Sequence, residues 1–247
     1  MRPIPGLLAL LVGVSSAQGQ PSPRISPSPK PAASSRPTAS PKPSASPKPS
    51  VAQKKKGDLP PLLQEVEAHY GKSTTLSANF SQVSHSATGT TKKSSGVVEF
   101  KRPNKFRWQV TQPDPSISVS NGIKAWHYTP PFDEEDHGQV LVRPASEVQT
   151  KLANALLSGS FSVIRDMKIT PSGSNGFVLV PKRGSAGTVR KARIEVNPDT
   201  KFIWKVTLDH AGGNRAEITL SNIQLGKQLS DDQFNFKVPP NTDQAEP

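Results

Sequence analysis

The fold of this 247-residue chain is decided by two neighbouring stretches, Lys101-Arg-Pro-Asn-Lys-Phe-Arg-Trp108 and Val119-Ser-Asn-Gly-Ile-Lys-Ala-Trp-His-Tyr-Thr-Pro130. Apolar and polar residues alternate from Phe106 to Val110, which is the pattern of a strand with one apolar face. Asn121-Gly122 is a typical tight turn between two strands. Both stretches therefore predict antiparallel β-structure that carries aromatic side chains.

The same alternation marks two later segments. In residues 202–209 we expect one face to carry Phe202, Trp204, Val206 and Leu208, and in residues 216–221 we expect Ala216, Ile218 and Leu220 to share a face. Turn residues separate the strands at Asn121-Gly122, Asn175-Gly176, Asn197-Pro198-Asp199 and Gly212-Gly213-Asn214. Together these signals predict about ten strands.

Two segments have helical periodicity instead. Asp58 is expected to cap a first helix that ends at Gly71 and has an apolar face of Leu62, Leu63, Val66 and Tyr70. Ser146 and Gln149 form a capping-box pattern for a second helix that ends before Gly159, with an apolar face of Val148, Leu152, Ala155 and Leu156. Many strands and few helices predict a mainly β (α+β) fold, in which a strongly curved antiparallel sheet is covered by these helices.

The N-terminal quarter differs in composition from the rest. Residues 1–19 combine Arg2, an apolar run and small residues, which predicts a cleaved signal peptide. Residues 20–57 are rich in Pro, Ser and Lys and are interpreted as a disordered tether, which leaves residues 58–247 as one domain. Nine basic residues and no acidic residue precede Asp58, so the formal charge of +12 falls to about +3 beyond it. The basic charge therefore favours a solvated tail over a nucleic-acid site, with binding to anionic cell-wall polymer or lipid headgroups as the alternative.

The sequence does not predict an enzyme. The five histidines show no paired metal-ligand spacing, and the acidic run Asp133-Glu-Glu-Asp-His137 is interpreted as a solvated loop, with a cation site as the alternative. There is no Gly-x-Ser-x-Gly motif, and the chain has no cysteine. We therefore expect no metal, no cofactor, no disulfide and no lipid anchor.

The first block of the domain resembles the LolA family of periplasmic lipoprotein carriers. The resemblance rests on Leu76-Ser-Ala-Asn-Phe-Ser-Gln82, on Gly96-Val-Val-Glu-Phe-Lys-Arg-Pro103 running into Phe106 and Trp108, and on the turn that leads into Trp126 and Tyr128. Phe177-Val-Leu-Val-Pro-Lys182 and Phe234-Asn-Phe-Lys-Val-Pro-Pro240 are also similar to that family. The chain departs from the family in its tether, its acidic loop and its short tail after Pro240.

The resemblance implies an incomplete β-barrel with a helical lid over an apolar cavity. It implies that Arg102 is a latch that binds lid backbone and that acyl chains contact Phe80, Phe100, Phe106, Trp108, Trp126, Tyr128, Val148, Leu152 and Leu156. From the residues alone, the aromatic side chains could equally be ordinary barrel core and Arg102 a solvated charge.

The partners implied are outer-membrane lipoproteins as cargo, an inner-membrane ABC-type exporter and an outer-membrane acceptor. The expected protein is a periplasmic monomer that binds no nucleic acid. A lipid or glycolipid sensor of related fold, or a cell-wall-associated structural protein, remains the alternative.

Overall fold

The computed structural model describes residues 59–133, 135–147, 151–165, 167–182 and 188–245. The predicted signal peptide, tether and capping Asp58 lie outside these residues, as do Val148 and Gln149 of the second predicted helix. In the part of the chain that is described, no helix is long and apolar enough to cross a membrane.

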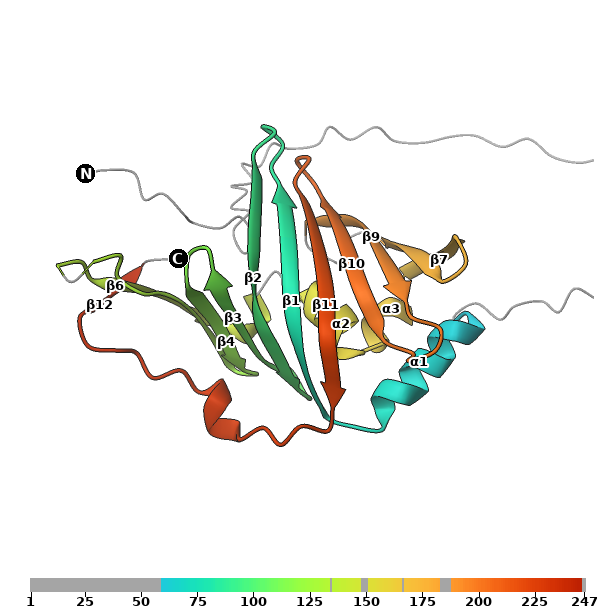
Figure 1. Ribbon diagram of the computed structural model, residues 1–247, viewed down its shortest axis with the longest axis horizontal. Helices are drawn as coiled ribbons and strands as arrows, with labels where there is room; N and C mark the ends of the chain where they lie inside the picture. Colours follow the sequence, from blue (N-terminus) through green and yellow to red (C-terminus); the bar gives the residue numbers. More distant parts are fainter. Residues whose placement is uncertain (1–58, 134, 148–150, 166, 183–187, 246–247) are drawn as a thin grey trace, which may run out of the picture. The chain divides into compact units, whose positions relative to one another are not determined.

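Twelve strands of the described residues form a single sheet (Figure 1). They are β1 (Thr75–His85), β2 (Thr91–Lys101), β3 (Lys105–Gln112), β4 (Ser116–Asn121), β5 (Lys124–Thr129), β6 (Gly138–Pro144), β7 (Met167–Ser172), β8 (Gly176–Pro181), β9 (Val189–Val196), β10 (Ile203–His210), β11 (Arg215–Leu225) and β12 (Thr242–Ala245). Their spatial order is β12-β6-β5-β4-β3-β2-β1-β11-β10-β9-β8-β7, and the ladders are antiparallel except for the parallel pair β12 and β6. The prediction of a mainly β fold on a curved, incompletely closed antiparallel sheet is confirmed.

The helices are short, and α1 precedes the first strand. They are α1 (Pro61–Gly71), α2 (Lys151–Ser158) and α3 (Ser162–Arg165), with the 3-10 turns η1 (Ala145–Glu147) and η2 (Asp231–Phe234). The N-cap of α1 is Pro60, which makes no side-chain capping bond, so the prediction that Asp58 caps this helix is wrong. Pro61 fits the first turn because its missing N–H has no intrahelical partner there.

One face of the sheet is apolar and carries the helices. Strand register places Phe100 opposite Phe106, Val98 opposite Trp108 and Phe80 opposite Gly96, so these aromatic rings share one face. The contacts of α2 are with β2 and β10, and α3 contacts β7. At the end of α1, the backbone N–H of Ile203 donates to the Tyr70 hydroxyl over 3.1 Å. The core therefore lies between this face and the three helices.

Close packing fixes the end of α2. Gly159 has φ +70°, and a Cβ at this position would lie 2.1 Å from Cδ1 of Tyr70. Glycine is needed here both for the left-handed backbone and for the contact between the end of α2 and α1. The predicted ends of both helices, at Gly71 and before Gly159, are confirmed.

The first residues of β10 do not follow the predicted alternation. Ile203 is fully buried, whereas Trp204 is 37% exposed. The ladder with β9 shifts register between Ile203 and Lys205. A β-bulge adds one residue to a strand and reverses the facing of the side chains before it, so the expected core position of Trp204 is wrong.

The C-terminal segment crosses the opposite face of the sheet. Leu229 and Phe234 pack with Val119 of β4 in a second apolar cluster, which also contacts Trp126. Lys101 Nζ donates to the Leu229 carbonyl over 2.8 Å, and the Asp231 carboxylate pairs with both Lys101 and Lys105. These contacts hold the pKa of the Asp231 carboxyl below its ordinary value. Beyond Pro240, the tail adds β12 to the edge strand β6.

Candidate functional site

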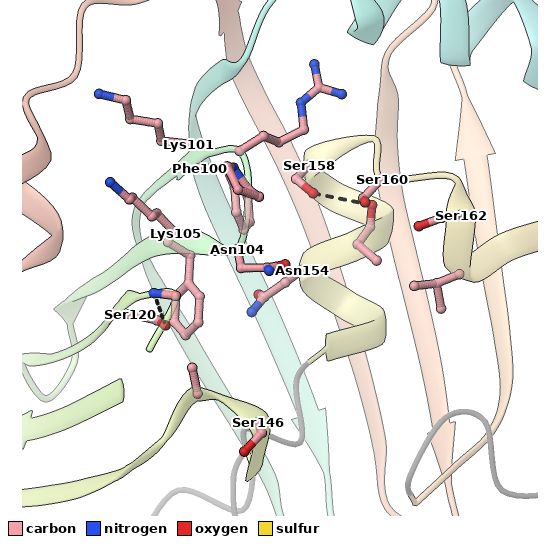
Figure 2. Close-up of a pocket in the computed structure, with 17 residues that line it drawn as sticks. Phe100, Lys101, Asn104, Lys105, Ser120, Ser146, Asn154, Ser158, Ser160 and Ser162 are labelled. Carbon is pink, nitrogen blue, oxygen red and sulfur yellow. Dashed lines mark hydrogen bonds between the residues drawn. The ribbon is translucent and has the colours of Figure 1, made fainter. Parts of the chain in front are cut away.

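A cavity of about 550 Å³ opens between the turn that joins β2 to β3 and the helices α2 and α3 (Figure 2). Its lining comes from segments that are far apart in the chain: the turn around Arg102, the ends of β4 and β6, and residues 154–163. Phe100, Phe106, Ala155 and Val163 are its apolar wall. The cavity therefore opens onto the apolar face of the sheet.

Much of the lining is polar. Serine and asparagine side chains surround the opening, namely Asn104, Ser120, Ser146, Asn154, Ser158, Ser160 and Ser162. In Figure 2, Asn104 and Asn154 approach the cavity from opposite sides, whereas Lys101 and Lys105 point away from α2. The expectation of an apolar cavity is thus met only by its inner wall. Sequence reasoning missed the polar rim, although serines at every second position from 158 to 162 were a visible signal.

Arg102 lies at this opening and contacts backbone carbonyls. Its Nη2 donates to the Tyr70 carbonyl over 2.7 Å and also to the Ser73 carbonyl, while its own N–H donates to the Thr74 carbonyl over 2.8 Å. The carbonyls at the C-terminal end of a helix have no intrahelical partner, so a cation is favourable there. Arg102 therefore joins the β2 to β3 turn to the end of α1.

The predicted aromatic contacts divide between the two faces of the sheet. Phe100 and Phe106 line the cavity, and deeper on the same face the rings of Phe80 and Trp108 lie 4.5 Å apart between centroids. All four belong to the core cluster on the helix-covered side or pack against it. These four residues therefore lie together on the helix-covered face, and their contact with acyl chains stays a prediction.

Trp126 and Tyr128 lie on the other face. Register pairs Trp126 with Val119, and Trp126 packs against the cluster formed by Val119, Leu229 and Phe234. The ring of Tyr128 lies 5.3 Å from that of Phe236. Although Trp126 also borders a small second cavity, its pairing and packing place its ring beneath the C-terminal segment. The prediction that these two residues face the cavity is wrong, because they belong to an apolar patch on the outer face that packs against the C-terminal segment.

The second helix contributes differently from the prediction. Leu152 and Leu156 are buried in the core, whereas the polar side of α2, with Asn154 and Ser158, lines the cavity. Val148 lies outside the described residues. The apolar residues of α2 thus hold the helix on the sheet, and its polar residues meet the opening.

The small second cavity, of about 40 Å³, lies next to Phe106. It is lined by Phe106, Ala125, Trp126, His127, Leu141, Arg143 and Glu147. His127 Nδ1 lies 2.8 Å from the Ser118 hydroxyl, and burial lowers the pKa of His127. Sequence reasoning did not single out Arg143, which has no motif around it.

No cluster of His, Cys, Asp or Glu suited to a metal ion occurs within the described ranges. In the acidic loop, Asp133 Oδ1 accepts from the backbone N–H groups of Glu135 and Asp136. These residues are exposed, as expected for a solvated loop.

The family model and the sequence relatives agree on one family. Residues 71–237 match the family described as outer membrane lipoprotein carrier protein LolA. An outer-membrane lipoprotein carrier protein of Azotobacter vinelandii is 32% identical over 73% of this chain and 86% of its own length. The protein of the same name from Vibrio parahaemolyticus is 34% identical over 66% of this chain and 76% of its own length. Among solved structures, a LolA superfamily protein from Nitrosomonas europaea is 10% identical with a TM-score of 0.39, covering 70% of this chain and 95% of that chain. On the strength of the family match and the sequence relatives, this chain belongs to the LolA family of outer-membrane lipoprotein carrier proteins.

Proposed function

We propose that this chain is a periplasmic carrier, which binds the acyl chains of lipoproteins released from the inner membrane and delivers them to the outer membrane. The observation that carries the proposal is the position of the cavity. It opens directly onto the apolar face of a curved sheet, with Phe100 and Phe106 on the shared wall. The names of the sequence relatives support the same cargo.

The energetics of the cargo require such shielding. Exposure of an acyl chain to water costs about 0.8 kcal/mol for each methylene, so a chain of about sixteen carbons is worth roughly 12 kcal/mol. Free diffusion of a lipoprotein between membranes is therefore negligible. A carrier has to cover the chain with apolar surface and still release it.

Loading requires the helices to move. Side chains fill most of the apolar face, since Leu156, Ile164 and Ile218 have no exposed surface. A long acyl chain therefore gains further apolar contact only when α2 or α1 shifts on the sheet. The bonds from Arg102 to the end of α1 oppose this movement and favour the empty state.

The proposed partners follow from this route. An inner-membrane ABC-type exporter would load the carrier, and an outer-membrane acceptor would receive the cargo. We propose a monomer that uses neither a cofactor nor nucleic acid, because the only reaction required is the transfer of acyl chains between apolar sites.

The proposal is tested with spheroplasts of the source cell. The purified protein should collect lipoprotein in a soluble complex, and Phe106→Glu should not, although it remains folded. The new carboxylate, even if it pairs with a neighbouring cation, places a charged and hydrated group where the acyl chain needs an apolar wall. Circular dichroism checks the fold, and immunoblotting of the supernatant measures the complex.

Gln109→Glu is the matched control. Gln109 is exposed on the same strand, and its side chain points to the face opposite Phe106. This variant should collect lipoprotein as the wild type does. A wild-type protein that collects no lipoprotein would refute the carrier function, whereas normal collection by Phe106→Glu would only remove Phe106 from the site.

A further inference from the structure

We infer that Arg143 is a specificity-determining residue of the cavity, which binds the oxygen of a carboxyl-derived group at the head of an acyl chain. The group is the ester or amide carbonyl of a lipoprotein or the carboxylate of a fatty acid. This inference rests on the proposed function and adds a cationic contact beside the apolar wall of the site.

Strand register places Arg143 in line with the cavity wall. Phe106 pairs with Ser120, Ser120 with Ala125, and Ala125 with Arg143, across β3, β4, β5 and β6. Side chains that are paired in this way point to the same face of the sheet. Arg143 therefore shares the helix-covered face with Phe106, although 37 positions separate the two residues in the sequence.

The two residues between Phe106 and Arg143 are small. Ser120 and Ala125 are 1% and 8% exposed, and neither fills the space between the aromatic ring and the guanidinium. The small cavity lies in this space, with Leu141 and His127 as further walls. Phe106 lines both this cavity and the larger one, so the space beside Arg143 and the larger cavity share one wall residue.

The guanidinium of Arg143 lacks a partner where it is buried. Its Nε is the one buried side-chain nitrogen or oxygen of the described residues that has no hydrogen-bond partner. An unsatisfied buried donor typically costs about 1 to 3 kcal/mol, and more when it is charged. Arginine stays protonated at physiological pH, so its Nε is a charged donor that an entering acceptor can bind.

The neighbouring groups do not supply that acceptor. Glu147 borders the same cavity, but its carboxylate does not accept a hydrogen bond from Arg143 Nε. On the same face, His127 Nδ1 is engaged with the Ser118 hydroxyl. Burial lowers the pKa of His127, so its ring is neutral near pH 7 and adds no second positive charge.

The walls indicate the class of ligand. Phe106, Ala125 and Leu141 are apolar, and the guanidinium is the cationic donor among them. A guanidinium binds carboxylate and carbonyl oxygens through several N–H groups in one plane. The first carbons of an acyl chain combine an oxygen with an adjoining methylene run, which matches this arrangement better than a fully polar solute.

The test measures the affinities of three ligands for the purified full-length chain. They are a dipalmitoylated lipopeptide with ester bonds, palmitate, and N-phenyl-1-naphthylamine, which is an apolar dye without oxygen. Arg143→Met keeps an unbranched apolar side chain and removes the guanidinium. We expect this substitution to lower the affinity for the lipopeptide, for palmitate or for both by about tenfold, a factor that corresponds to one good hydrogen bond. Binding of the dye should change less than about twofold.

Two variants control for charge and for folding. Lys124→Met removes an exposed cation at the neighbouring end of β5 and should leave all three affinities unchanged. The Tm of ligand-free Arg143→Met should equal or exceed that of the wild type, because the buried Nε donates no hydrogen bond that the substitution would remove. Arg143→Lys retains the charge but not the planar fork, and should recover only part of the affinity.

Each outcome supports or overturns the proposed role of Arg143. Greater loss for the lipopeptide assigns Arg143 to the ester or amide of the cargo, and greater loss for palmitate assigns it to a free carboxylate. Unchanged affinity for both acyl ligands, or an equal loss for the dye, overturns the role of Arg143 while leaving the carrier function intact. A wild-type chain that binds none of the three overturns both proposals.

Discussion

Single side chains decide how the helices are attached to the sheet. Arg102 bonds to the Tyr70 and Ser73 carbonyls and at the same time lines the cavity, so it couples the opening to the end of α1. Charged hydrogen bonds typically contribute about 1.5 to 3 kcal/mol each. A free energy of this magnitude is large enough to hold α1 in place, yet small enough for the binding of an acyl chain to offset.

We expect Arg102→Leu to load cargo and to release it more slowly than the wild type. The substitution removes bonds that favour the empty state and adds apolar surface for the chain, and each 1.4 kcal/mol changes the equilibrium by about tenfold. The off-rate of a fluorescent lipopeptide measures the effect. Lys92→Leu, which removes an exposed cation from the preceding strand β2, is the control. Equal or faster release from a folded Arg102→Leu would leave Arg102 as a cap of α1 only.

His127 makes stability depend on pH. Burial holds the pKa of His127 below its ordinary value of 6.5, so the unfolded chain binds more protons than the folded chain as the pH falls below 6.5. The stabilising contribution of the neutral ring is complete above that pH and is lost below it. His127→Gln should therefore lose less Tm than the wild type between about pH 7.5 and pH 5.5. Burial also lowers the pKa values of His69 and His210, so both proteins should lose some Tm over this range. Parallel curves of Tm against pH would therefore show that His127 is solvated.

At the level of elements, the sheet has two apolar faces over β3 to β5. Trp108 packs against the core beneath the helices, and Trp126 packs beneath the C-terminal segment with Phe234. Alternation in the sequence assigns residues to two sets but does not say which set the helices cover. The β-bulge at Trp204 shows the same limit, since one added residue reverses the facing of a strand end.

The two tryptophans provide a matched experiment. Trp108→Ala should weaken binding of N-phenyl-1-naphthylamine several-fold, whereas Trp126→Ala should leave the affinity of the folded protein unchanged. Both variants should lower the free energy of unfolding, by less than the roughly 3 to 5 kcal/mol of a fully buried tryptophan, because each ring is partly exposed. Chemical denaturation gives the stabilities and dye titration the affinities. Loss of affinity in Trp126→Ala alone would reverse the assignment of the faces.

The ends of the sheet are protected against pairing with another chain. β12 has only four residues, and β7, at the other end, contains Pro171, which lacks a backbone donor. Proline and short length both limit edge-to-edge association. The open sheet therefore exposes little regular edge, which fits the proposed monomer.

At the scale of the whole molecule, residues 20–57 are predicted to be a tether that is independent of the domain. Removing them while retaining the signal should change Tm by less than about 2 °C, which is under 1 kcal/mol for a domain of this size. Lipopeptide affinity should also be unchanged. Thermal unfolding and titration of both proteins make the comparison.

Deletion of residues 59–71 is the contrasting control. That segment includes Leu63, Val66 and Tyr70, which are buried in the core, so its loss should unfold the domain or lower Tm strongly. A comparably large drop after removal of residues 20–57 would show that the domain begins earlier than residue 58.

Local patterns in the sequence predict the fold class, most of the strands, the ends of both helices and the common face of Phe106 and Trp108. These features depend on local alternation, glycine and turn residues, all of which act within a few positions along the chain. No such pattern predicts that the C-terminal segment covers Trp126, that β12 pairs with β6, or that Arg143 lies in line with Phe106 across the sheet. Such contacts join residues far apart in the sequence, and their positions are set by strand order and register, which no local pattern specifies.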